Sequence, residues 1–426
     1  MSGAAYTSEL AQALAEDVLE RFLRYVRVDT QSKRDRERSP STPGQLELSR
    51  MLVAELKAAG LEDAELDEHG YVFATLPGNV DGVPVIGLIA HVDTSPDAPG
   101  AGVEPIVHRG YDGGAIELPK GGTVIDPQSM HELAHARGHD IVTSSGDTLL
   151  GADDKAGVAE IMAAVAHLAA NPQLPRPTIR VGFTPDEEIG EGATLFDVER
   201  FGARCAYTLD GSDLGELQDE TFTGSEVTLE IHGVDVHTGW AKGKLVNAAR
   251  LAGEVLARLP ADLAPERTDG RAGFIHPFEV HATAAHATIR AIVRDFEDAL
   301  LERHVETIRR IAEEVVASAP GARLEFGSRH QYPNMRRHLE PHPQIVAAAE
   351  EAMRAEGVEP VRTPIRGGTD GSRLSAMGLP TPNVFTGGHE YHSVREWASL
   401  QEMAAAAATI VRLAGVWARA DVPAAA

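Results

Sequence analysis

The chain has 426 residues, 43% of them hydrophobic, and its 64 acidic against 39 basic side chains give a formal net charge of −25. The length predicts two or three domains, and the negative charge argues against nucleic acid or an anionic membrane surface as a partner. A single cysteine, Cys205, excludes an intramolecular disulfide and cysteine-based metal motifs. The first residues lack the apolar region of a signal peptide, and no apolar run approaches the roughly 20 residues of a membrane span. We therefore expect a cytoplasmic protein.

Strands and helices alternate through the first half of the chain. Apolar side chains recur every four residues in the first helix, and the second opens with Thr42-Pro43-Gly44-Gln45, a capping-box pattern with proline at the first helical position. Near-continuous apolar runs indicate strands that are buried on both faces. The expected elements are helix 8–28, helix 42–60, strand 71–76, strand 83–90, helix 156–170, strand 178–183 and strand 205–209, with 94–146 mostly loop. This order predicts an α/β fold with a mainly parallel sheet.

The pattern changes near residue 222. The expected elements are then strand 226–231, helix 246–259, strand 280–294, helix 295–319, strand 323–326, helix 343–356, strand 381–385 and helix 399–417. The strands before residue 332 alternate between apolar and polar residues, so one face of their sheet is expected to be open. We predict a larger discontinuous domain, 1–221 and 332–426, into which a smaller α+β domain of β-α-β type, 222–331, is inserted. An open face or edge of this inserted sheet would be a dimerisation surface.

Residues of the types that bind metals follow several predicted strands. His91-Val92-Asp93 ends one apolar run, Asp186-Glu187-Glu188 ends another, and Asp210 ends a third. Asp153-Asp154 precedes a helix, and His392 lies near the end of the chain. Open α/β sheets place their sites beyond the carboxyl ends of their strands. These side chains are therefore candidates for one shared site.

Each group alone has an ordinary explanation. Asp153-Asp154 could be a pair of acids at a helix N-terminus, where the helix dipole stabilises them, and the acidic run at 186–188 could be a solvated turn. Two adjacent aspartates nevertheless repel each other, and a divalent metal would compensate them. The coincidence of such groups at several strand ends favours a metal site. A neighbouring carboxylate with a raised pKa could then serve as a general base.

A competing metal motif lies in the segment predicted as loop. His131-Glu132-Leu133-Ala134-His135 matches H-E-x-x-H, the zinc-binding helix of one class of proteases, and His139 extends the histidine spacing. The motif requires a sturdy helix, whereas Gly138 interrupts this segment. Ile141 also occupies the position of the third ligand that the extended motif needs. We therefore expect a histidine-rich helical turn in a loop.

The assembled motifs resemble those of the M20 family of metallopeptidases over nearly the whole chain. They are His91-Val92-Asp93, Leu149 to Gly157, Thr184 to Gly190, Asp210-Gly211, His232 to Asn247, Arg294-Asp295-Phe296, Pro364 to Ser372 and His392 to Trp397. So many matches in one order are specific, although each alone is weak. The resemblance implies a zinc-peptidase catalytic domain with the inserted domain serving for dimerisation or as a lid.

The resemblance also implies a set of metal ligands. Two Zn²⁺ ions per subunit, replaceable by Co²⁺ or Mn²⁺, would be bridged by Asp153, and the peptide bond after this residue is often cis in the family. His91 and Asp210 would complete one site, and Glu188 and His392 the other. An aspartate at position 210 goes with the aminopeptidase members of the family.

Further roles follow from the same resemblance. Glu187 would be the general base and acid, and Asp93 would orient the imidazole of the first ligand. His237 would stabilise the developing oxyanion, in the site of the partner subunit of a homodimer. Arg294 and Arg366 would bind the terminal carboxylate of a peptide or charge in the transition state, the other interpretation being surface or sheet arginines.

One motif departs from the family pattern. The family's Gly-Gly-Tyr-Asn-Tyr-His reads Gly387-Gly388-His389-Glu390-Tyr391-His392 here, which places two histidines close together. We assign the ligand to His392, because the family's His-x-x-x-Glu frame then runs through Glu396.

The expected function is a metal-dependent aminopeptidase that releases the N-terminal residue of short peptides, chiefly tripeptides. The nearest alternative is another activity of the same family, such as a dipeptidase, aminoacylase or carboxypeptidase. A non-catalytic metal-binding scaffold is a third interpretation, but Glu187 beside Glu188 argues against it, because a scaffold has no use for a general base.

Overall fold

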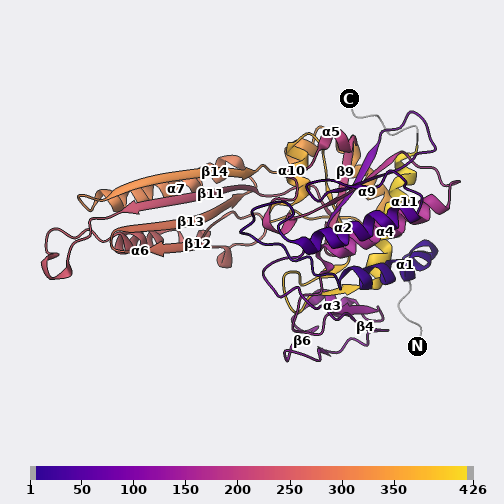
Figure 1. The fold of residues 1–426 in the computed structure, drawn as a ribbon, viewed down its shortest axis with the longest axis horizontal. Coiled ribbons are helices and arrows are strands. Elements are labelled where there is room, and N and C mark those ends of the chain that lie inside the picture. The colour runs from indigo at the N-terminus through magenta and orange to yellow at the C-terminus, as the bar shows by residue number, and fades with distance from the viewer. Residues whose placement is uncertain (1–5, 420–426) are drawn as a thin grey trace. The chain divides into compact units, whose positions relative to one another are not determined.

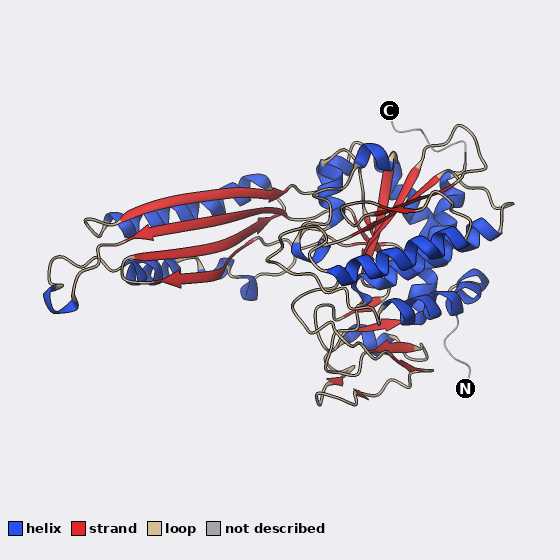
Figure 2. Ribbon diagram, in the orientation of Figure 1, coloured by secondary structure: helices blue, strands red, loops and turns tan. Residues whose placement is uncertain are grey.

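The computed structural model describes residues 6–419, which form two compact units (Figures 1 and 2). Unit 1 comprises the residues up to Asp219, Arg337–Thr363, and the residues from Thr369 onward. Unit 2 comprises Glu220–Arg336 and the short segment Pro364–Gly368. No helix among residues 6–419 is long and apolar enough to cross a membrane.

Unit 1 is built on an eight-stranded sheet. In spatial order its strands are β1 (Glu65–Leu66), β2 (Val72–Leu76), β8 (Ile179–Thr184), β3 (Ile86–His91), β9 (Cys205–Gly211), β16 (Asn383–Phe385), β10 (Glu216–Gln218) and β15 (Val361–Arg362). The central run β8-β3-β9-β16 is parallel, whereas β1, β2 and β10 add antiparallel pairs. All six residues of β3 are buried, as its continuous apolar sequence predicts. The prediction of a mainly parallel α/β sheet is confirmed.

Helices cover this sheet. They are α1 (Glu9–Tyr25), α2 (Pro43–Ala58), α4 (Ala152–Ala170), α5 (Val198–Phe201), α9 (Pro343–Ala355), α10 (Asp370–Ala376) and α11 (Leu400–Trp417). The short helix α3 (His131–His135) packs in a separate apolar cluster with Ile141 and Trp397, and α8 (Arg336–Leu339) begins at the last residue of one segment of unit 2. Helix α4 packs against β3 and β9, and α1 and α11 pack against α4 (Figure 1). A side chain at Gly157 would lie 1.9 Å from the carbonyl oxygen of Leu209, so only glycine allows α4 to approach β9 so closely.

The capping box predicted at the start of α2 is wrong. Thr42 is the N-cap residue, but its side chain accepts no capping bond from the helix backbone. The amide of Gln45 instead donates to the Asp186 carboxylate at 2.8 Å, and its oxygen accepts from the Asp186 backbone N–H at 3.1 Å. The side chain of Gln45 therefore bonds to Asp186 rather than to the backbone N–H of the N-cap residue, which is the bond that a capping box requires.

The segment 94–146 has more regular structure than predicted. It contains α3 and four short strands, β4 (Ile106–His108), β5 (Ile116–Glu117), β6 (Val124–Ile125) and β7 (Ile141–Thr143). Strands β4 and β7 form a second sheet with β17 (Gly388–His389) and β18 (Trp397–Ser399), in the order β17-β18-β7-β4. Strands of two or three residues are too short to produce a recognisable alternation. Two of these partners also come from the far end of the chain.

Unit 2 is a four-stranded antiparallel sheet covered by two helices. Its strands lie in the order β12 (Phe274–Ala282), β13 (His286–Asp295), β11 (Thr223–His232) and β14 (Arg323–Tyr332). Helices α6 (Ala248–Arg258) and α7 (Asp298–Ala317) contact each other and the sheet (Figure 1). Strands β11 and β13 alternate buried with half-buried positions over most of their length, and the buried side chains form one apolar core with the helices.

The predicted strand 280–294 is two strands rather than one. A turn at Thr283, whose backbone N–H donates to the His286 carbonyl at 2.7 Å, separates β12 from β13. The residues inside the turn, Ala284 and Ala285, carry no turn signal, so the alternation continues through it. Pro277 also argues against a strand at β12, because proline cannot donate a ladder hydrogen bond. It is tolerated there because β12 is an edge strand. The order of unit 2 is therefore β-α-β-β-α-β.

Candidate metal centre

Parallel strand ends bring the predicted ligands together. Strands β8, β3 and β9 are neighbours and run in the same direction, so their carboxyl ends meet at one edge of the sheet. His91 is the last residue of β3, and Asp210 lies at the end of β9. Glu187 and Glu188 lie in the short 3₁₀ turn that follows β8. The arrangement corresponds to the usual place of a site in an open α/β sheet.

Four side chains converge there around Asp153. The Nε2 atom of His91 lies 2.9 Å from one Asp153 carboxylate oxygen and 3.6 Å from Asp210 Oδ1. The other Asp153 oxygen lies 3.2 Å from Nε2 of His392, which in turn lies 2.9 Å from Glu188 Oε2. Asp153 therefore stands between two imidazoles, with one further carboxylate on each side.

The two adjacent aspartates have different surroundings. The peptide bond between Asp153 and Asp154 is cis, as the family resemblance implied. Asp154 lies within reach of His91 and Asp210, but its carboxylate accepts hydrogen bonds from the backbone N–H groups of His91 at 3.1 Å and Gly157 at 3.2 Å. Asp153 faces the imidazoles, whereas Asp154 ties the start of α4 to the end of β3.

Asp93 connects the two ligand-bearing segments. Its carboxylate accepts hydrogen bonds from the backbone N–H groups of Glu187 at 2.9 Å and Glu188 at 3.2 Å. One of its oxygens also lies 3.4 Å from Nδ1 of His91, and Nδ1 lies 3.1 Å from the Asp93 carbonyl oxygen. Asp93 is fully buried. It therefore fixes both the imidazole and the turn that carries the two glutamates.

Asp186 also fixes the turn that carries Glu187 and Glu188, a role that the sequence did not indicate. Asp186 adopts a left-handed conformation with φ of 60°, and its carboxylate accepts bonds from the Ser41 backbone N–H at 2.8 Å and the Gln45 amide at 2.8 Å. Aspartate tolerates this conformation better than most residues. These bonds hold the turn in place from Ser41, just before α2, and from Gln45 in its first turn, and no local pattern pairs Ser41 with Asp186.

Burial and crowding shift the pKa values of the side chains in this cluster. Burial, followed by the charge of Asp153, raises the pKa of Glu188 to about 8, and burial raises that of Asp210 to about 6. Burial also raises the pKa of Glu187 well above its usual value, with Asp210 among the acids that add to it. For His392, burial lowers the pKa, but the bonds to Asp153 and Glu188 outweigh it and raise the pKa to about 11. Several carboxylates are thus held together at a high electrostatic cost.

The donor set fits divalent metal ions. Imidazole nitrogens and carboxylate oxygens are ligands that Zn²⁺ takes in proteins. Among residues 6–419, two overlapping groups place their donor atoms close enough to hold a metal: His91, Asp154 and Asp210, and His91, Asp153 and Glu188. Glu188 Oε1 is buried without a hydrogen-bond partner, which is costly unless a cation satisfies it. A divalent ion would both satisfy this atom and offset the crowded negative charge.

Comparison with known proteins identifies the family. The pattern of peptidase family M20/M25/M40 matches residues 127–415. A relative called Peptidase T, from Vibrio parahaemolyticus, is 47% identical over 403 residues, which cover 94% of this chain and 98% of the relative. The chain belongs to this family of peptidases.

Solved structures agree with the fold of this M20 peptidase. Aminopeptidase PepT from Bacillus cereus has a TM-score of 0.74 at 25% identity, over 95% of this chain and 99% of that one. A tripeptidase from Staphylococcus aureus has a TM-score of 0.76 at 21% identity, over 95% of this chain and 98% of that one. The predicted fold class, a parallel-sheet catalytic domain with an inserted α+β domain, is confirmed.

The two neighbouring histidines of the peptidase lie in different places. His392 reaches Asp153 and Glu188, whereas His389 is buried elsewhere. The Nε2 atom of His389 lies 2.9 Å from Glu402 Oε2, and its ring stacks on Trp397 with centroids 4.0 Å apart. The structure therefore brings His392, the residue chosen from the sequence, to the cluster.

Three predicted residues belong to unit 2. His237 is exposed, accepts a bond from the Gly239 backbone N–H at 3.1 Å, and has its ring centroid 4.6 Å from that of Trp240. Arg294 is buried in β13 and donates to the carbonyls of Ser225 at 3.3 Å and Val293 at 3.1 Å.

Arg366 also lies in unit 2 and makes several contacts there. Its guanidinium donates to the carbonyl oxygens of Gly270 and Ala272, each at 2.8 Å, and to Thr268 Oγ1 at 2.9 Å. It also lies over the ring of Phe222, 5.2 Å from the centroid. Arg366 therefore fastens the segment Pro364–Gly368 to the turn before β12, a role that its sequence motif did not indicate.

The H-E-x-x-H segment is a separate surface feature. It forms α3, a helix of five residues in which His131 and His135 are exposed, with ring centroids 4.3 Å apart. Neither belongs to a group of metal-binding side chains among the described residues. His139 lies 2.8 Å from Ser399 Oγ through its Nδ1 atom. The expectation of a short histidine-rich turn fits this geometry.

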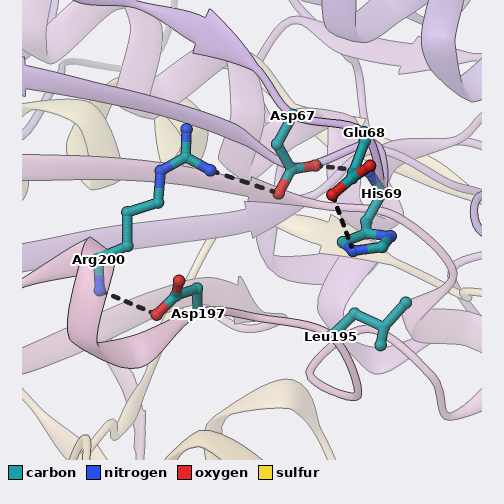
Figure 3. A pocket seen from close by; sticks show the side chains of 6 residues that line it. All are labelled: Asp67, Glu68, His69, Leu195, Asp197 and Arg200. Carbon is teal, nitrogen blue, oxygen red and sulfur yellow. Dashed lines mark hydrogen bonds and ion pairs between the residues drawn. The ribbon is translucent and has the colours of Figure 1, made fainter.

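A surface pocket of about 370 Å³ in unit 1 also lies apart from the cluster (Figure 3). Its lining residues are Asp67, Glu68, His69, Leu195, Asp197 and Arg200. The Arg200 guanidinium faces Asp67 at 4.0 Å and pairs with Glu65 at 2.6 Å, so the positive charge of the pocket is compensated within the protein. None of the predicted site residues lines it.

Proposed function

We propose that this peptidase is a metal-dependent aminopeptidase that releases the N-terminal residue of tripeptides. The observation that carries the proposal is the convergence of Asp153 with two histidines and two carboxylates beside Glu187. Its relatives that are called Peptidase T match almost the whole chain, which supports an aminopeptidase of this type. We infer that the substrates are short peptides with a free N-terminus.

We assign two Zn²⁺ ions to each subunit, with Co²⁺ or Mn²⁺ able to substitute. His91, Asp153 and Asp210 would hold one ion, and Asp153, Glu188 and His392 the other. Asp93 would orient His91 through its Nδ1 atom. Bound divalent ions of this kind lower the pKa of water and polarise a carbonyl oxygen.

Glu187 is the proton-transferring residue in this proposal. Desolvation raises the pKa of its carboxyl well above the usual value, so Glu187 holds a proton more readily than an exposed glutamate does. Glu187 would accept the proton of the attacking water and later donate it to the amine of the leaving peptide. The bond from the Glu187 backbone N–H to the Asp93 carboxylate holds this glutamate beside the segment that carries His91.

Residues of unit 2 complete the proposed reaction. His237 would stabilise the oxyanion in the site of the partner subunit, so the active form would be a homodimer. Arg294 and Arg366 would supply cations for the terminal carboxylate of the peptide or for transition-state charge. We assign residues 1–221 and 332–426 to catalysis and residues 222–331 to dimerisation or lid closure, and we place the enzyme in the cytoplasm.

A panel of free and N-acetylated di-, tri- and tetrapeptides tests the proposal. The chain is loaded with Zn²⁺, Co²⁺ or Mn²⁺, and products are identified by mass spectrometry. We expect the N-terminal residue to be released from free tripeptides and the acetylated peptides to resist cleavage. Release of a C-terminal residue from acetylated peptides would instead indicate a carboxypeptidase, and cleavage of free dipeptides alone would indicate a dipeptidase.

A further inference from the structure

Glu396 makes an unusual set of contacts with the turn before α4. Its Oε2 atom accepts hydrogen bonds from the backbone N–H groups of Leu150 at 2.7 Å and Gly151 at 2.9 Å. Its Oε1 atom accepts a third from the backbone N–H of Asp153 at 3.1 Å. One carboxylate therefore holds three backbone groups of the turn that presents Asp153.

Burial makes these bonds costly to lose. Glu396 is 1% exposed, and Leu150 is fully buried. A buried N–H group that loses its acceptor is destabilising, because no water replaces the bond. Gly151 also has a left-handed φ of 86°, so the turn does not continue the helix and needs an external acceptor for its N–H groups.

The position of Glu396 in the chain links two ligands. It lies four residues after His392 and immediately before β18 (Trp397–Ser399). Its carboxylate holds the turn of Asp153, and the imidazole of His392 lies 3.2 Å from the carboxylate of that same Asp153. Asp153 is therefore held on its backbone side by Glu396 and on its side-chain side by His392, from a single short segment.

We propose that Glu396 is a positioning residue that sets the metal affinity of the cluster by fixing the backbone of Asp153. Glu396 contacts neither the substrate nor the metal ions in this account. It acts by holding the two Asp153 oxygens at the imidazoles of His91 and His392. The inference rests on the proposed metal-dependent function. Partners of this kind typically change metal affinity about 10–100-fold when they are altered.

Substitution of Glu396 by glutamine tests the inference at constant side-chain size. In Glu396→Gln, the side-chain NH₂ group faces at least one of the backbone N–H groups that donate to the carboxylate in the wild type. Two donors cannot bond to each other, so we expect the turn to be displaced. Glu396→Ala removes the side chain altogether. The matched control is Glu160→Gln, because Glu160 is a fully buried glutamate in helix α4, the helix that follows the turn held by Glu396, and its oxygens have no hydrogen-bond partner.

The measurement is Zn²⁺ affinity of the metal-stripped full chain, by competition with a chromogenic chelator. It is carried out at a temperature at which circular dichroism shows each variant to be folded. We expect Glu396→Gln to bind Zn²⁺ about 10–100-fold more weakly than the wild type, and Glu160→Gln to bind it equally well. At saturating Zn²⁺, the tripeptide KM of Glu396→Gln should stay close to the wild-type value.

Three outcomes contradict the inference. Wild-type Zn²⁺ affinity in Glu396→Gln would do so, and so would an equal loss of affinity in Glu160→Gln, which would show a general effect of altering a buried carboxylate. A lower unfolding temperature of metal-free Glu396→Gln with unchanged Zn²⁺ affinity would make Glu396 a stabilising residue only. A wild-type chain that binds no Zn²⁺ would overturn the proposed function itself, which distinguishes the two failures.

Discussion

Two groups of histidines and acids in unit 1 differ in how they are assembled. The α3 helix carries His131, Glu132 and His135 within five residues, in a pattern that matches a known zinc motif. The cluster at Asp153 draws its members from segments as far apart as residues 91 and 392. The two histidines of the local group lie on the surface. In the dispersed group, the side chains of His91, Glu188, Asp153 and Asp210 are only 3–12% exposed, and His392 is the exposed member at 42%. The difference shows that the surroundings of the ligands matter more than their spacing.

The physical reason is desolvation. His131 and His135 are exposed to water on a five-residue helix, and among residues 6–419 no further donor lies close enough to complete a metal site with them. His91 and Glu188 have side chains only 3% and 4% exposed, and Asp93 holds the segments that carry both. Buried carboxylates repel one another unless a cation is present. The dispersed cluster is thus preorganised for a divalent ion.

The largest expected effect comes from Asp153→Ala. Among residues 6–419, Asp153 is the only carboxylate that faces both His91 and His392, so the variant should bind fewer than two Zn²⁺ ions per chain and lose hydrolysis to background. Metal content is measured by atomic absorption after dialysis. Full occupancy by two ions in this variant would rule out the bridging role.

Glu187 and Glu132 distinguish the Asp153 cluster from the α3 motif. Glu187→Gln should lower kcat for a tripeptide about 10²–10⁴-fold with metal retained, since it removes the group that transfers the proton. Glu132→Gln, at the equivalent position of the α3 motif, should leave kcat unchanged. Steady-state kinetics with Zn²⁺ measures both, and near wild-type turnover by Glu187→Gln would refute its assignment.

His389 offers a third histidine site, which is predicted to act on stability. Burial lowers its pKa, but contacts with Asp213 at 3.2 Å and Glu402 at 2.9 Å raise it from 6.5 to about 9. The protonated ring is therefore favoured in the folded state, and this stabilisation is complete below pH 6.5 and lost as the pH rises through about 9. The full effect is roughly 3 kcal/mol.

Urea unfolding at several pH values tests this prediction. The free energy of unfolding of the wild type, relative to His389→Gln, should be highest below pH 6.5 and should shrink by roughly 3 kcal/mol by about pH 9.5. Because His389→Gln leaves the Asp153 cluster intact, its Zn²⁺ content should equal that of the wild type. A difference between the two proteins that does not vary with pH would contradict the assignment.

The smallest expected effect is that of the double variant His131→Ala/His135→Ala. Both side chains are exposed and contact each other, so their removal should change stability by less than about 0.5 kcal/mol. Zn²⁺ content and tripeptide turnover should match those of the wild type. Loss of Zn²⁺ or of turnover would instead favour the interpretation in which the H-E-x-x-H motif binds zinc.

Some parts of this molecule could be predicted from the sequence, and others could not. The continuous apolar run before His91 indicated a buried strand, and parallel strand ends then explained why His91 and Asp210 meet. The family resemblance added His392 and the cis peptide bond after Asp153. These features could be predicted because they depend on apolar runs and on the order of motifs, both of which can be read directly from the sequence.

The contacts that hold the ligand-bearing turns could not be predicted from the sequence, because they join distant segments of the chain. The bond between Ser41 and Asp186 and the three bonds to Glu396 form only when the fold brings these residues together. The turn at Thr283 was missed because two alanines inside it look like strand residues. Glu396 could have been singled out only by its fixed spacing from His392, and that spacing says nothing about what the carboxylate holds.

The most direct test of the central claim is anomalous X-ray diffraction at the zinc edge, on crystals grown with Zn²⁺. We predict two peaks per chain, one between His91, Asp153 and Asp210, and one between Asp153, Glu188 and His392. A peak at His131 and His135 with none at Asp153 would contradict the account.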